Sequence, residues 1–176
     1  FTRIVTFSNL LNEEINLNIE FYNPGTQNVN NATATLMTTS SDLVEIVGQD
    51  ANIGSLNADS KKNISDAFTI KVKDNVPNQE YAFFTMTVTD GTNTWNQDLV
   101  YKIQAPEFEV FDVSYSDELG NNNSFVEAGE TIKVHFKIRN HGDVKSDVIL
   151  VEGSSSNQYV SFENDSVELD GIEVDQ

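Results

Sequence analysis

The chain has 176 residues, of which 28 are acidic and 10 are basic, so its formal net charge at pH 7 is −18. This acidic balance argues against binding to nucleic acid or to an anionic membrane surface, and we expect neither partner. The absence of cysteine excludes disulfides, cysteine-based zinc sites and thiol nucleophiles. The sequence has no apolar run long enough for a membrane-spanning helix, so we expect no membrane insertion.

The chain contains an internal repeat. The segment 12–25 reappears as 129–142, with Asn23 matched to Asn140 and the same alternation of apolar and polar residues before it. A repeat of this length predicts tandem copies of one domain, an architecture of modules, in place of a single catalytic fold.

A short segment that ends at Pro106 separates the two copies, because proline blocks the continuation of a β-ladder. We therefore predict a first domain over 1–106 and a second over 107–176. Aligning the copies places the end of the second where the first still has strands to come. We expect the second domain to be incomplete and the chain to be a piece of a longer protein. The alternative is that a partner chain supplies the missing strands by β-augmentation.

Alternation of apolar and polar residues predicts β-strands along most of the chain. The alternation is strict over 15–22 and recurs over 132–139, and no stretch of ten or more residues has a helical period. Turn residues at 23–25, 74–78 and 90–93 separate strands, and the last of these predicts a hairpin. In chain order we predict strands over 4–7, 15–22, 32–38, 43–46, 68–72, 81–89, 95–103, 108–115, 132–139, 147–152 and 159–162.

Short strands separated by turns predict an all-β fold in which each copy is an antiparallel β-sandwich with Greek-key connections, the second copy being incomplete. Strict alternation indicates one buried face and one solvated face in each copy. Truncating a residue of the buried face to alanine is expected to cost roughly 2–5 kcal/mol of stability. The predicted core residues are Ile15, Leu17, Ile19 and Phe21 in the first copy and Ile132, Val134, Phe136 and Ile138 in the second.

The sequence offers little for catalysis. Its two histidines, His135 and His141, fall on the solvated face of a strand and in a turn. It has no Gly-x-Ser-x-Gly nucleophile elbow and no glycine-rich phosphate loop. We therefore predict that the chain has no enzymatic activity of its own.

One loop, 117–130, gathers oxygen-bearing side chains between two predicted strands. Ca²⁺ binds six to eight oxygen ligands, so this composition predicts a calcium site in the second copy, where the first copy has a shorter loop. The alternative is a solvated, Asn-rich turn with residues in the left-handed conformation. The candidate metal ligands are Asp117, Asn121, Asn123, Glu127 and Glu130.

Two aromatic residues, Trp95 and Tyr101, are candidates for a second kind of site. Sugar-binding modules stack sugars on aromatic faces, so these residues would form the platform of a carbohydrate-binding site. The alternative is that they pack against the core. Loss of a glycan-array signal in Trp95→Ala would favour the platform, and an unfolded variant would favour packing.

The second copy resembles a known family of modules. Its acidic Asn-rich loop, the Ala128–Glu130 segment, the following strand and the Asn140–Gly142 turn are similar to CARDB-like, adhesion-type Ig-like repeats. Such repeats accompany the catalytic domains of secreted bacterial peptidases, including gingipain-like peptidases of Bacteroidetes. Ala128 stands where the family has Pro, and Glu127 where it has Asp.

The resemblance implies tandem Ig-like sandwiches in a secreted or cell-surface bacterial protein. Their function would be that of a non-catalytic spacer or interaction module of a larger protein, a peptidase being the parent that the resemblance implies. The implied partners are other domains of the parent protein, and protein or glycan at the cell surface. The alternative function is that of an adhesin or carbohydrate-binding module.

Overall fold

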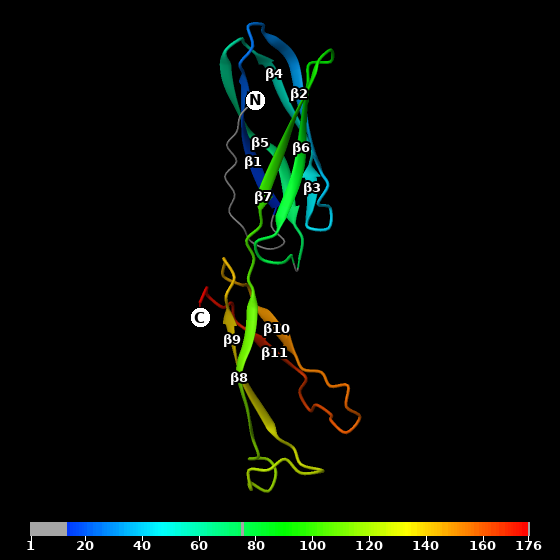
Figure 1. The fold of residues 1–176 in the computed structure, drawn as a ribbon, viewed down its shortest axis with the longest axis vertical. Helices are drawn as coiled ribbons and strands as arrows, with labels where there is room; N and C mark the ends of the chain where they lie inside the picture. The colour runs from blue at the N-terminus through cyan, green and yellow to red at the C-terminus, as the bar shows by residue number, and fades with distance from the viewer. Residues whose placement is uncertain (1–13, 75, 176) are drawn as a thin grey trace. The chain divides into compact units, whose positions relative to one another are not determined.

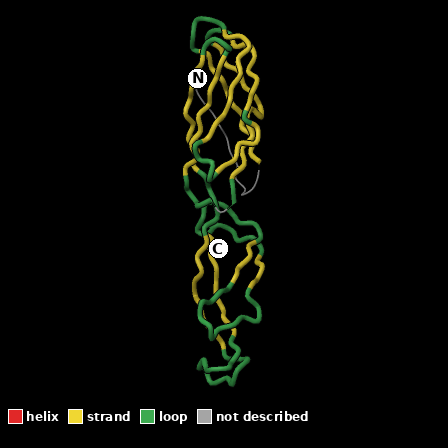
Figure 2. Tube along the Cα trace, turned by 90° about the vertical axis from the view of Figure 1, so that its right-hand side faces the viewer, coloured by secondary structure: helices red, strands yellow, loops and turns green. Residues whose placement is uncertain are grey.

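The computed structural model describes residues 14–74 and 76–175, so the strand predicted over 4–7 lies outside the described residues. Every element in the described part of the chain is a β-strand, as Figure 2 shows, and every pair of strands is antiparallel. The predicted all-β class is therefore confirmed. Over the same residues there is no helix that could cross a membrane.

The chain divides into two compact units, 1–105 (unit 1) and 106–176 (unit 2), which are described separately. Unit 1 is a β-sandwich of two sheets, with strand orders β1-β5-β3 and β4-β2-β6-β7 (Figure 1). Its strands are β1 (Glu14–Asn23), β2 (Val29–Thr38), β3 (Val44–Gly48), β4 (Asp50–Leu56), β5 (Ser60–Val72), β6 (Tyr81–Thr89) and β7 (Thr94–Lys102).

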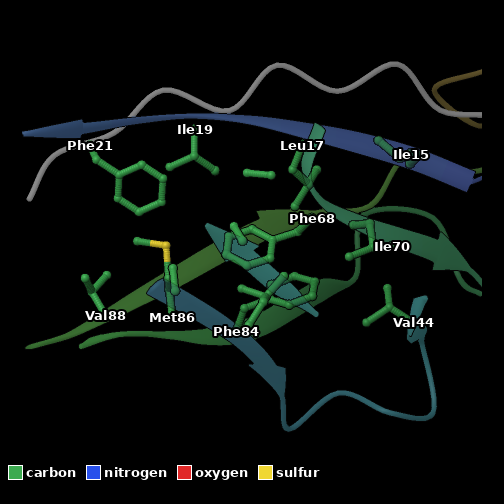
Figure 3. Close-up of a cluster of buried hydrophobic side chains, with 14 of the residues drawn as sticks. Ile15, Leu17, Ile19, Phe21, Val44, Phe68, Ile70, Phe84, Met86 and Val88 are labelled. Atoms are coloured by element: carbon green, nitrogen blue, oxygen red, sulfur yellow. The ribbon is translucent and has the colours of Figure 1, made fainter. Parts of the chain in front are cut away.

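The core of unit 1 lies between these two sheets. Alternate residues of β1 are buried and exposed, which confirms the core predicted for the first copy. Figure 3 shows the buried side chains of β1 directed toward Phe84, Met86 and Val88 of β6, in the opposite sheet. The period of two along the strand thus supplies one apolar face to each sheet, and the two faces cover each other.

The chain crosses from one sheet to the other at Gln49, the single residue between β3 and β4. The strand β3 pairs with β5, whereas β4 pairs with β2, and the N–H of Leu36 donates to the carbonyl of Gln49 at 2.8 Å. Sequence analysis did not predict β4, since it contains turn-forming residues such as Gly54, whose φ is +70°. The strand predicted over 68–72 covers only the C-terminal part of β5, because the N-terminal half of β5 is mostly polar and exposed.

The hairpin predicted at 90–93 is confirmed, because β6 and β7 pair from Thr89 and Thr94 outward. The carboxylate of Asp90 closes its turn by accepting the backbone N–H groups of Thr92 at 2.9 Å and Asn93 at 2.7 Å. The N–H groups of Asn93 and Thr92 lower the pKa of Asp90, because they stabilise its charged form.

Unit 2 contains two two-stranded sheets, β8-β9 and β10-β11 (Figure 1). The strand predicted over 159–162 is wrong, since these residues form a turn and irregular chain. Their match in unit 1, β3, pairs with β5, and no counterpart of β5 is found among the described residues of unit 2. The strands are β8 (Phe108–Ser116), β9 (Lys133–Asn140), β10 (Ile149–Glu152) and β11 (Ser166–Leu169).

The core predicted for the second copy is also wrong. Ile132 and Ile138 are half-buried, while Val134 is 54% exposed and Phe136 is 37% exposed. The described residues of unit 2 include no buried hydrophobic side chain. The physical reason is that strands equivalent to β5, β6 and β7, which pair with or cover β1 and β2 in unit 1, do not occur in the described part of unit 2.

The repeat is nevertheless visible in a buried asparagine that ends β1 and β9. Asn23 is 6% exposed and Asn140 is fully buried, and each side-chain oxygen accepts the N–H of the glycine two residues later, Gly25 at 3.0 Å and Gly142 at 2.9 Å. Each amide also donates to the carbonyl four residues on and to a distant segment, so the turn is tied to the rest of its unit. The acceptors are Gln27, Leu56 and Asn57 for Asn23, and Val144 and Ile172 for Asn140.

Leu17 and Val134 occupy matched positions of the two copies and test the difference in burial. Leu17→Ala is expected to lower the free energy of unfolding of unit 1 by about 2–5 kcal/mol, because Leu17 is 2% exposed in a packed core. Val134→Ala is expected to change stability by less than about 0.5 kcal/mol. Urea unfolding followed by the fluorescence of Trp95, the single tryptophan, measures unit 1, and circular dichroism follows the whole chain. Equal losses in both variants would contradict the structure.

The Asp90 turn predicts a pH dependence. The pKa of Asp90 in the folded chain is expected to lie below its ordinary value of 3.8, as measured by NMR titration of its carboxyl carbon. Because the folded pKa is the lower one, the stabilisation is present at neutral pH and is lost as pH falls through the folded pKa. Asp90→Asn is expected to remove this pH dependence, and an ordinary titration of Asp90 would show that the turn does not form.

Candidate functional site

The loop that joins β8 to β9 contains all five predicted metal ligands. Asp117 directly follows β8, and Glu130 lies three residues before β9. The ladder between the strands extends to the pair Ser116–Lys133, so antiparallel pairing brings the two ends of the loop together. Residues that are distant along the loop therefore become neighbours, with Asp117 next to the carboxylate of Glu130.

The side chain of Glu127 organises the middle of this loop. Its Oε2 accepts hydrogen bonds from the side-chain amides of Asn121 at 2.7 Å and Asn123 at 2.8 Å. The amides of Asn121 and Asn123 lower the pKa of Glu127, because they stabilise the carboxylate form. These three predicted ligands are brought together, but their side chains are bonded mainly to one another and to the loop.

Glu130 is held by backbone donors. Its Oε1 accepts the N–H of Asn121 at 3.3 Å, and its Oε2 accepts the N–H of Glu127 at 3.0 Å. Within the same loop Asn122, Ser124 and Gly129 have positive φ values. The loop is therefore a tight structure with three residues in the left-handed region.

Asp117 is the most deeply buried acidic residue of the loop, with 5% of its surface exposed. Its Oδ2 accepts the backbone N–H groups of Asn123 at 2.8 Å and Ser124 at 3.2 Å, and its backbone carbonyl accepts the N–H of Gly120 at 3.1 Å. Its Oδ1 is buried without a hydrogen-bond partner, the only side-chain nitrogen or oxygen in this state among the described residues.

A classical cluster of three or more His, Cys, Asp or Glu ligands is absent from the described residues. The loop instead presents two carboxylates, of Asp117 and Glu130, beside Gly120. The sequence alone did not indicate a role for Gly120. The only hint was that this glycine lies three residues after Asp117 in the same loop. The role of a glycine at this position depends on the space between the two carboxylates, which only the folded loop defines.

The two candidate aromatic residues lie in β7 of unit 1. Both Trp95 and Tyr101 are half-buried and pack against the hydrophobic core. Burial raises the pKa of the Tyr101 hydroxyl, because desolvation disfavours its charged form. This placement supports a packing role for both side chains.

The two histidines lie near the β8-β9 ladder. His141 Nε2 is 2.9 Å from Glu109 Oε2, which also accepts a hydrogen bond from Arg139 at 2.8 Å. Arg139 and then His141 lower the pKa of Glu109. His135 Nε2 lies 3.4 Å from the hydroxyl of Ser116. Both histidines are exposed and contribute to contacts across the paired strands.

No protein-family model, curated protein or solved structure matches this chain. Two features of the described residues are energetically unfavourable and therefore indicate binding: the exposed apolar strands of unit 2 and the buried, unpartnered carboxylate oxygen of Asp117.

Trp95→Ala tests the packing role. We expect it to lower the free energy of unfolding of unit 1 by roughly 1–3 kcal/mol, less than for a fully buried tryptophan, as measured by urea unfolding and circular dichroism. Tyr81→Ala is a suitable control because Tyr81 is 50% exposed on the neighbouring strand. An unchanged free energy of unfolding in Trp95→Ala would contradict the packing role and would favour Trp95 as part of a binding site.

Proposed function

We propose that the chain is a non-catalytic Ig-like spacer and interaction module of a larger secreted or cell-surface bacterial protein, a peptidase being the parent that its sequence resembles. The observation that carries this proposal is the uncovered apolar face of unit 2. Together with the largely unpaired edge of β9, a face of this kind supports an interaction by strand addition.

The pairing of strands in unit 1 supports the Ig-like part of the proposal. In an Ig sandwich, strands B and E are neighbours in one sheet, and strands C, F and G form the other. The pair β1-β5 and the run β2-β6-β7 match this arrangement, with β4 added beside β2. In unit 2, β9 and the β10-β11 pair correspond to β1 and the β2-β4 pair of unit 1.

The apolar residues of unit 2 are grouped on one face. Val134 and Ile138 alternate along β9, and their ladder partners Tyr115 and Val110 on β8 therefore share their face. Val110, Tyr115 and Val134 are each more than half exposed. Isolated exposed apolar residues are ordinary, but a contiguous group on a sheet indicates an interaction surface.

The occupant that fits this surface is an extended segment with the pattern of β5. In unit 1, β5 pairs along β1, with Leu17 opposite Phe68 and Ile15 opposite Ile70. In unit 2, β9 is the match of β1. Among the described residues it pairs along its length only with β8, and one isolated bridge joins Asn140 to Val174. One edge of β9 is thus largely free to accept a strand through backbone hydrogen bonds.

Charge favours the same occupant. Residues 107–176 contain sixteen acidic and four basic residues, whereas β5 contains three lysines and one aspartate. A basic strand with alternating apolar residues would complement both the charge and the apolar face of unit 2. We assign this donor strand to another domain of the parent protein.

A synthetic peptide with the sequence Ser60–Val72 tests the proposal. Added to the full chain, it is expected to bind saturably and to slow amide hydrogen exchange in β9, because strand addition protects backbone N–H groups. The control peptide carries serine in place of Ile64, Phe68 and Ile70, keeps the three lysines and one aspartate, and is expected not to bind. In the chain, Phe136→Asp is expected to abolish the protection.

Three outcomes would overturn the proposal. One is equal binding of both peptides, which would indicate charge attraction alone. Another is protection confined to unit 1. The third is self-association of the chain through β9 without peptide, measured by analytical ultracentrifugation, which would identify a second copy as the occupant.

A further inference from the structure

The buried carboxylate of Asp117 is incompletely satisfied. One oxygen, Oδ2, accepts hydrogen bonds from two backbone N–H groups. The other, Oδ1, has no hydrogen-bond partner, although only 5% of the residue is exposed. A buried carboxylate oxygen without a partner costs the free energy of its desolvation, so such atoms are rare in folded proteins. The orphaned oxygen therefore points to a positively charged or hydrogen-donating ligand.

A second carboxylate borders the same space. A Cβ atom at position 120 would overlap Asp117 Oδ1 and would lie 3.1 Å from Glu130 Oε1. Both oxygens therefore lie beside the position that a Cβ of residue 120 would occupy, and glycine at this position lets the two carboxylates approach each other. Asp117 Oδ1 lies against Gly120, on the side that faces Glu130 Oε1.

No basic side chain neutralises these two groups. Residues 117–130 contain four acidic residues and no lysine, arginine or histidine. Among the described residues, the ion pair nearest in sequence joins Lys133 to Glu118, and neither Asp117 nor Glu130 takes part in an ion pair. Two carboxylates that share a site repel each other unless a cation or a proton lies between them.

We propose that the space beside Gly120, between Asp117 Oδ1 and the carboxylate of Glu130, binds Ca²⁺. Backbone N–H donors hold Asp117 through its Oδ2 and Glu130 through both of its oxygens, so the two carboxylates are pre-positioned. Ca²⁺ takes oxygen ligands in flexible geometry and completes its shell with carbonyls and water, whereas Mg²⁺ demands near-octahedral geometry. The site goes beyond the proposed strand addition and does not depend on it.

This assignment divides the five predicted ligands into two groups. Asp117 and Glu130 are the ligands. Asn121, Asn123 and Glu127 form the scaffold that holds the loop, since their side chains are bonded to one another. Gly120 is a positioning residue, because a side chain at this place would fill the site.

Titration of the full chain with Ca²⁺ alone, followed by the NMR shifts of the loop amides and by thermal unfolding, tests the site. We expect saturation with a Kd on the order of 10⁻⁴–10⁻³ M, the range of extracellular modules, and weaker binding of Mg²⁺. Asp117→Asn keeps the shape of the side chain, and Gly120→Ala fills the space without changing charge. Each is expected to weaken Ca²⁺ binding at least tenfold.

Glu118→Gln is the matched control. It removes one charge from an exposed residue of the same loop, and we expect it to bind Ca²⁺ like the parent chain. Far-ultraviolet circular dichroism checks the fold of each variant, and Asp117→Asn serves as the test if Gly120→Ala does not fold.

Unchanged binding in Asp117→Asn would overturn the proposal. An equal loss in Glu118→Gln, equal affinity for Mg²⁺, or no saturation up to about ten times the expected Kd would also do so, because each indicates screening by a diffuse acidic surface.

Discussion

The structure depends on one constraint: the apolar face of an alternating strand must be covered by a second layer. Unit 1 meets it, since the side chains of β1 and β5 in one sheet pack on those of β2 and β6 in the other. Each buried side chain of this size contributes about 1.5–3 kcal/mol, so the two-layer arrangement supplies most of the favourable free energy. The described part of unit 2 has the same alternation but only the two-stranded sheet β10-β11 beside β8-β9, and its apolar residues remain in contact with water.

The two units share local devices despite this difference. Asn23 and Asn140 close equivalent turns with equivalent hydrogen bonds, and the pairs β2-β4 and β10-β11 are equivalent ladders. These features require only segments that both copies contain. A repeat can therefore reproduce its turns and some of its ladders where it does not reproduce its core.

The two proposed roles of unit 2 have a common origin in the β8-β9 ladder. The ladder presents an apolar face with a largely free edge, and at its far end it brings Asp117 and Glu130 together. Proteins place binding functions on loops and edges held by a rigid scaffold, because these parts change without loss of the core. Strand addition would use the edge of this ladder, and Ca²⁺ would hold the loop at its end.

The sequence by itself determined the all-β class, the β6-β7 hairpin and the core face of β1, because each follows from local periodicity or turn chemistry. Its composition also identified 117–130 as a loop rich in oxygen-bearing side chains. It did not reveal β4, whose polar and glycine residues are tolerated because β2 lies beside it. It predicted a buried face over 132–138, where the alternation is present but counterparts of β5, β6 and β7 are not among the described residues. Burial depends on a second element, and the space between Asp117, Gly120 and Glu130 depends on a folded loop, so only the tertiary structure decided both.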